Sequence, residues 1–293
     1  MSLSVRSIDE RVSRYSMPSR QSVPKFFFTC LLNSALRKAG CACIGKMFYN
    51  FFFTQYKGAL LRNIPVVNVE HPLDEEIPFL PQKVNIYLGF FSFWIRTASF
   101  LNRIYPDRKE CAADFIASIG RLYKAAAEVY AACFSTTKRP HYLGTFRFVL
   151  IHAFDPHLMC IPSLHVMLVI RTYTAFASII RTSGDSEMYA RQAAELRRCA
   201  LAITESVLYV KQHSVNCVSA AMYAMTRFDP QLFTEKDAEA FAGDLFTDNT
   251  VPSAVAGRIR EHILSLYRRF LAQGESSADW TEPLLAFLEE RKT

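Results

Sequence analysis

Several features that mark other protein classes are scarce or missing in this 293-residue chain. Glycine occurs only 10 times, and we find neither an internal repeat nor a low-complexity segment beyond a Ser/Arg-rich start, which argues against a repeat protein. No block of Lys and Arg and no basic-aromatic repeat accompanies the net charge of +7, so nucleic acid is not an expected partner. The first 25 residues are polar, and no cleavable signal peptide is expected there.

The eight cysteines do not have the spacing of a zinc site. The pair Cys41 and Cys43 is too tight and stands alone, and most of the others sit inside apolar runs, where cysteine acts as a small hydrophobic residue. The polar residues His152, Asp155 and His157 match no established ligand pattern either. We therefore expect no bound metal and no cofactor.

Apolar and aromatic residues are abundant instead. They make up 51% of the chain, with 24 Phe and 13 Tyr, which is too apolar for a disordered protein and too aromatic for an ordinary soluble helical one. Six apolar segments have lengths that suit helices, and clusters of Pro, Asp and Asn separate them. They are residues 44–62, 83–101, 112–134, 160–180, 195–211 and 214–228.

Two fold readings fit these segments. Mean hydropathy is close to zero and every eighteen-residue window contains a charge, so a strict hydropathy rule finds no membrane span. Arg96, Lys124, Glu128 and Arg171 would each have to pair, snorkel or face a polar cavity if their segments crossed lipid. The alternative is a large soluble helical bundle with unusually apolar core helices.

The distribution of charge favours the membrane reading. With six crossings, one side receives the basic N-terminus and the loops around residues 103–109 and 181–198, whereas the other side receives the acidic stretch 70–76 and both histidine motifs described below. The positive-inside rule then places both termini in the cytoplasm and the histidines outside. We predict an all-α, six-helix, multi-pass protein of the cell membrane.

Three regions follow from this prediction. Residues 1–43 are expected to form a basic, partly disordered cytoplasmic N-terminus, and residues 44–228 the six-helix core. Residues 229–293 are expected to be a helical cytoplasmic tail, because Ile259, Ile263, Tyr267 and Phe270 recur at helical spacing beside arginines. The amphipathic helix in this tail could pack on the core or lie on anionic lipid.

Two short motifs carry the candidate chemistry. The first reads Pro-Ser-Leu-His and ends at His165, and the second reads Lys-Gln-His and ends at His213. Each places a histidine in a polar pocket within an apolar run. Such a pair suits phosphoryl transfer, since one imidazole can carry the phosphoryl group while the other protonates the leaving oxygen.

Together these motifs resemble the second and third motifs of the phosphatidic acid phosphatase type 2 superfamily, in the branch of inositol phosphorylceramide synthase-like membrane proteins. The resemblance covers roughly residues 60–228 and extends to Arg139-Pro140, which is similar to the end of the first motif, and to residues 74–79, which resemble a segment of bacterial members. It implies the six-helix fold and a phospholipid or lipid-phosphate substrate.

The resemblance also implies roles for individual residues. His213 corresponds to the nucleophile and His165 to the general acid. The expected phosphate ligands are Ser163 with the backbone at the start of the following helix, Arg139 as a bidentate clamp, and Lys211 as a point charge.

Three positions depart from the family pattern. Ala132 stands where the first motif has a lysine, and Val207 where the third has an arginine. Cys217 occupies the position of the aspartate that orients the nucleophilic imidazole, and loss of such a carboxylate slows catalysis severely. A thiolate at Cys217 could substitute in part. The sequence therefore predicts a lipid-phosphate phosphatase or phosphotransferase, with a catalytically inactive relative that binds headgroups or protein partners as the alternative.

Overall fold

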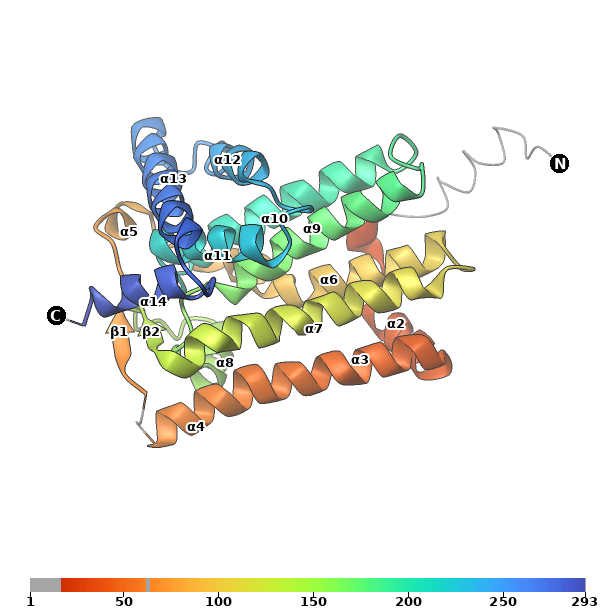
Figure 1. Cartoon of the computed structure of the whole chain (residues 1–293), viewed down its shortest axis with the longest axis horizontal. Helices are drawn as coiled ribbons and strands as arrows, with labels where there is room; N and C mark the ends of the chain where they lie inside the picture. The colour runs from red at the N-terminus through yellow and green to blue at the C-terminus, as the bar shows by residue number, and fades with distance from the viewer. Residues whose placement is uncertain (1–16, 62–63, 293) are drawn as a thin grey trace.

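The computed structural model describes residues 17–61 and 64–292. This part of the chain is almost entirely helical, which confirms the predicted all-α class (Figure 1). Four helices that coincide with predicted apolar segments form the body of a bundle, namely α6 (Val84–Ile104), α7 (Lys109–Ala132), α9 (Leu164–Thr182) and α10 (Ala190–Tyr209). The remaining predicted segments become α11 (Val215–Phe228) and a rod made of α3 (Ser34–Met47), the π-helical stretch η2 (Phe48–Phe53) and α4 (Thr54–Leu61).

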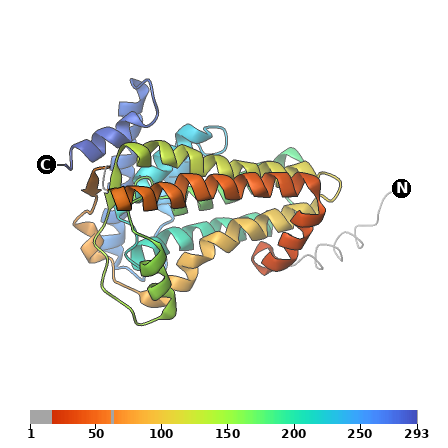
Figure 2. The same cartoon turned by 90° about the horizontal axis from the view of Figure 1, so that it is seen from below.

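The N-terminal region adds helices that the sequence analysis did not anticipate. These are η1 (Pro18–Arg20) and α2 (Val23–Leu32), followed by α3, which contains the predicted boundary between residues 43 and 44. The side chain of Asn33 caps α3 by accepting the N–H of Leu36 at 3.0 Å, a favourable way to begin a helix. Helix α3 lies along α7 (Figures 1 and 2), and its buried Leu36 and Cys43 tie it to the core. Residues 1–16, with several of the predicted cytoplasmic arginines, lie outside the described residues.

One end of the bundle carries the shorter elements (Figure 1). Strand β1 (Val66–Asn68) pairs in parallel with β2 (Phe134–Thr136), so that Val67 lies opposite Ser135. Near them are α5 (Leu73–Glu76) and α8 (Phe146–Phe154), and the 3-10 turn η3 (Pro81–Lys83) leads into α6. None of these elements was predicted. The strands, α5 and η3 have three or four residues each, too few for a periodic pattern to be recognised, and the nine-residue α8 lies between two predicted apolar segments.

The C-terminal region forms α12 (Glu235–Gly243), α13 (Ser253–Glu275) and α14 (Glu282–Glu289). The predicted amphipathic helix is present as α13, and its apolar residues Ile259, Ile263 and Phe270 are fully buried. Helix α13 packs against α11. Of the two arrangements left open by the sequence, the structure shows packing on the core.

The structure supports the membrane prediction only in part. Among the described residues, α9 is the one helix long and apolar enough to cross a membrane, and 67% of its most apolar stretch is buried in the protein, as in a core helix of a soluble protein. Helix α11 has 14 residues and spans roughly 21 Å, less than a bilayer core of about 30 Å. The outward face of α7 exposes Asp114, Arg121 and Lys124.

Charged side chains inside the predicted segments find polar partners. Arg171, in the middle of α9, is buried and pairs with Asp229 at 2.6 Å, while its Nε donates to Ser118 of α7 at 3.0 Å. Glu128 accepts a hydrogen bond from the indole of Trp280 at 3.1 Å. These contacts would serve equally in a bundle surrounded by lipid or by water, so they do not separate the two fold readings.

Candidate functional site

The two histidine motifs meet where the turn before α9 lies against the loop before α11. The hydroxyl of Ser135, on β2, accepts the backbone N–H groups of Cys160 at 3.1 Å and Ile161 at 2.7 Å, which fixes the turn that leads into α9. The hydroxyl of Tyr130, at the end of α7, donates to the carbonyl of Pro162 at 2.6 Å. Two elements that precede the turn in sequence, α7 and β2, therefore hold it in place.

His165 and His213 lie side by side. Nδ1 of His165 is 3.2 Å from Nε2 of His213, so one nitrogen of this pair donates a proton and the other accepts it. The ring of His165 also contacts Tyr87 and Phe90 of α6, at centroid distances of 4.8 and 4.3 Å. These aromatic walls and the neighbouring imidazole restrict the orientation of His165. The structure therefore brings the histidines of the two motifs together.

A small polar cavity adjoins the pair. Its volume is about 20 Å³, enough for roughly one water molecule. Three buried polar atoms of lining side chains have no hydrogen-bond partner among the described residues: Nε2 of Gln55, Oε1 of Gln212 and Nδ1 of His213. Because unpaired buried polar atoms are costly, they mark a place where a polar group or water is expected to bind.

A second, apolar cavity is also lined by His165. Its volume is about 420 Å³, and His165, Tyr87, Phe51 and Asp155 line both cavities. The further lining residues come from η2, α6, α7, α8 and α9 and are mainly aromatic or aliphatic, with Arg147 as a charged exception. His165 therefore lines both the polar cavity and the apolar cavity.

The three predicted phosphate ligands are engaged or enclosed. Arg139 forms an ion pair with Asp155 and donates a further hydrogen bond to its carbonyl at 3.0 Å. The ammonium of Lys211 donates to the backbone carbonyls of Asp74 and Ile77. The hydroxyl of Ser163, at the N-terminal cap of α9, is fully buried and has no hydrogen-bond partner within residues 17–61 and 64–292, and Ser163 is not among the residues that line the polar cavity.

Cys217 does not take the place of the orienting carboxylate. Its thiol is fully buried near the start of α11 and accepts the N–H of Ser214 at 3.4 Å, which completes a capping box. The other ring nitrogen of His213 has no partner among the described atoms. The buried thiol of Cys160 lies beside both His213 and Cys217, so the group next to the candidate nucleophile is a thiol and not the carboxylate that would hold one tautomer.

Asp74 is a site residue that the sequence analysis mentioned only as part of a resemblance. Its carboxylate accepts the backbone N–H groups of Val215 at 2.9 Å and His71 at 2.8 Å. Burial raises the pKa of this carboxyl, and hydrogen bonds from Ser214 and Val215 act in the opposite direction. A carboxylate so close to the His213 loop could not be inferred from spacing, because 141 residues separate Asp74 from Val215.

His157 and Thr137 were also not assigned to the site. The Oγ1 of Thr137 lies 2.8 Å from Nε2 of His157, which lines the polar cavity and has a left-handed backbone with φ of 61°. The backbone N–H of His157 donates to Asp155 at 2.8 Å. Gln55 lines the polar cavity as well, and it is a polar residue next to an apolar, aromatic run. That pattern is the one sequence signal that could have indicated a further site residue.

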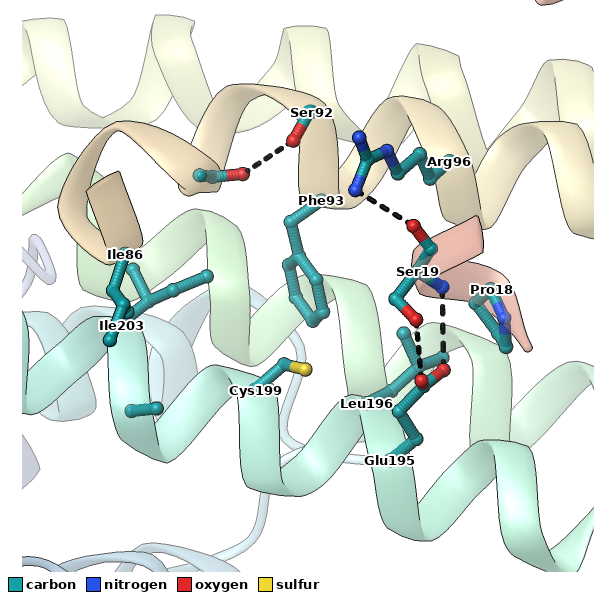
Figure 3. Close-up of a pocket in the computed structure, with 12 residues that line it drawn as sticks. Pro18, Ser19, Ile86, Ser92, Phe93, Arg96, Glu195, Leu196, Cys199 and Ile203 are labelled. Atoms are coloured by element: carbon teal, nitrogen blue, oxygen red, sulfur yellow. Dashed lines mark hydrogen bonds between the residues drawn. The ribbon is translucent and has the colours of Figure 1, made fainter. Parts of the chain in front are cut away.

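A third cavity, of about 280 Å³, lies apart from the histidines between η1, α6 and α10 (Figure 3). Arg96 donates to the carbonyl of Ser19 at 2.7 Å, and the Ser19 hydroxyl donates to Glu195 at 2.6 Å (Figure 3). Arg96 therefore ties the N-terminal turn to the bundle, and it does not reach the histidine site.

Within residues 17–61 and 64–292, no cluster of three or more potential metal-ligating side chains has a geometry that could hold a metal ion. The chain matches no protein-family model, no curated protein and no solved structure.

Proposed function

We propose that this chain is a membrane-associated phosphatase or phosphotransferase that acts on lipid phosphates through a phosphohistidine at His213. One observation carries the proposal: His165 and His213 are 3.2 Å apart, at the junction of a polar cavity and an apolar cavity of about 420 Å³. A phosphorylated headgroup suits the polar side and a hydrocarbon chain suits the apolar side. The resemblance of the two motifs to the phosphatidic acid phosphatase type 2 superfamily points to the same chemistry.

The reaction needs two steps. Nε2 of His213 forms a bond to phosphorus as the bond to the leaving alkoxide oxygen breaks, and His165 gives its proton to that oxygen. Water, or the hydroxyl of a second lipid, then attacks phosphorus while the N–P bond breaks. The proton of the attacking water or hydroxyl passes to His165. Because the polar cavity holds only about one water molecule, a phosphoryl group must approach from the apolar cavity and separate the two imidazoles.

The proposal includes contact with lipid. Large exposed hydrophobic side chains gather on α2 and along the α3–α4 rod, including Phe28 at 68% exposure, Leu32 at 89% and Phe48 at 64%. Helix α8 exposes Phe146 and Phe154 as well. Such a surface is unusual for a soluble monomer and suits hydrocarbon.

In its multi-pass form, the proposal places both termini in the cytoplasm and the histidines outside. The test is a topology reporter inserted in the loop around Asp74. A cytoplasmic reporter would contradict this orientation.

The activity test compares detergent-purified wild type with single-histidine variants on a panel of lipid phosphates. We expect phosphate release or headgroup transfer to disappear in His213→Ala and His165→Ala. The matched control is His141→Ala, since His141 is exposed and lines neither cavity at the histidine pair. An acid-labile phosphoryl adduct that is absent from His213→Ala would identify the intermediate.

A second candidate function is binding without turnover. Two observations favour it: Nδ1 of His213 has no hydrogen-bond partner among the described residues, and Arg139 and Lys211 are engaged with protein groups. In that case wild type and His213→Ala would give the same background rate. Vesicles containing phosphatidic acid would still bind the protein more tightly than vesicles of neutral lipid.

A further inference from the structure

The loop that carries His213 is attached on both sides to one short segment. After His213, the carboxylate of Asp74 accepts the N–H of Val215 at 2.9 Å and a hydrogen bond from the Ser214 side chain. Before His213, the ammonium of Lys211 donates to the backbone carbonyls of Asp74 and Ile77. Asp74 therefore contacts Lys211, two residues before His213, and also Ser214 and Val215, the two residues that follow it.

The backbone needs this support. Lys211 has a left-handed conformation, with φ of 55°, which non-glycine residues seldom adopt because the Cβ crowds the backbone. Such a conformation persists where surrounding contacts hold it. The two carbonyls that bind the Lys211 ammonium belong to α5 and to the residue just after it, so the strained turn depends on the same segment.

The attachment extends to the C-terminal region. The side-chain oxygen of Asn216 lies 2.8 Å from Nε2 of His262 on α13, and its amide donates to the carbonyl of Val69 at 3.0 Å. The ring of His262 stacks on His71 at a centroid distance of 3.8 Å, and the backbone N–H of His71 donates to Asp74. Residues 69–77 therefore form a brace between α13 and the His213 loop.

We propose that Asp74 is the positioning residue for His213. Its carboxylate holds the backbone just after the histidine, and its backbone carbonyl accepts from the Lys211 ammonium before the histidine. The aspartate expected at position 217 would instead hold the imidazole ring itself. Asp74 does not touch the ring, so it acts on where His213 is placed rather than on which tautomer it adopts. The catalytic consequence rests on the proposed function, while the structural consequence does not.

The first measurement is amide hydrogen exchange of the full-length protein in detergent. In Asp74→Ala, we expect exchange of the Val215 N–H to accelerate about tenfold or more, because its acceptor is removed, and exchange of the neighbouring residues 211–217 to rise as the loop opens more often. Exchange in the middle of α7 should stay unchanged. Glu75→Gln is the matched control, since Glu75 is an exposed carboxylate on the same short helix.

The second measurement is kinetic. Misplacement of a catalytic group by about 1 Å can cost roughly 100-fold in rate, so kcat should fall by about that factor in Asp74→Ala with little change in KM. Asp74→Asn keeps the shape and one acceptor oxygen, and it should recover part of both properties. If Asp74→Ala does not fold, Asp74→Asn replaces it in both measurements.

The outcomes separate the two proposals. Faster exchange at 211–217 in a protein whose wild type shows no turnover supports the brace and contradicts the proposed activity. Wild-type turnover with unchanged exchange and unchanged kcat in Asp74→Ala supports the activity and overturns the role of Asp74. Equal effects of Asp74→Ala and Glu75→Gln would also overturn it.

Discussion

Replacing Cys217 by aspartate should raise activity and lower stability. In the structure, the Cys217 thiol is fully buried and accepts the Ser214 N–H at 3.4 Å, while Nδ1 of His213 has no hydrogen-bond partner in the part of the chain that the structure describes. A carboxylate at this position would keep the capping role, and it would accept a hydrogen bond from the imidazole N–H once the ring turns toward it.

The two effects have different sizes. A better N-terminal cap contributes about 1 kcal/mol and a favourable helix dipole about 0.5 kcal/mol. Burying a carboxylate costs several kcal/mol, and Asp74 lies close enough to raise the pKa of any acid placed here. We expect a net loss of about 1–3 kcal/mol. An orienting carboxylate can be worth up to about 10⁴ in rate, so a gain of tenfold or more is expected.

Thermal unfolding and phosphate release, measured on the same preparations, test this expectation. Cys217→Asn is the matched control, because it has the shape of aspartate without the charge. A folded Cys217→Asp variant whose rate equals that of Cys217→Asn would refute the idea that His213 lacks an orienting carboxylate.

Three further predictions concern stability. Ser135→Ala leaves the buried N–H of Ile161 without its acceptor, while the N–H of Cys160 keeps the backbone carbonyl of residue 135 at 3.2 Å. It should lower the unfolding free energy by about 1–3 kcal/mol in chemical denaturation, and an unchanged value would contradict the role of Ser135 as anchor of the turn before α9. Asp229→Ala leaves the buried guanidinium of Arg171 without its carboxylate partner and should lower the unfolding free energy by about 2–3 kcal/mol. This is less than for a fully buried pair, because the Asp229 side chain is 26% exposed. A loss no larger than that of an exposed ion pair would contradict the prediction. Burial, and then the charge of His71, lowers the pKa of His262 to about 4, so the folded protein binds fewer protons than the unfolded chain and loses stability as pH falls from about 6.5 toward 4. For this partly exposed ring we expect about 1–2 kcal/mol, and melting curves at pH 7 and 4.5 should show a smaller pH effect in His262→Gln than in wild type.

The sequence indicated the long helices well, because their signal is local. Helices α6, α7, α9 and α10 coincide with predicted apolar segments, and α13 with the predicted amphipathic stretch. The segment at 214–228 became a helix too short to span a bilayer, because the polar turn around His213 ends the preceding helix at Tyr209. The six-span arrangement remains a prediction, since the outward charges of α7 and the single qualifying span do not establish it.

The sequence by itself determined the helical class, the apolar segments and the two histidine motifs, since each depends on neighbours within a few residues. Only the tertiary structure decided that His165 and His213, 48 residues apart, lie within 3.2 Å. It also decided that Asp74 braces the His213 loop across 141 residues, and that Arg139 and Lys211 are bound by protein groups. Such contacts depend on how helices pack against one another, and the local periodicity that reveals a helix carries no information about which partner it meets.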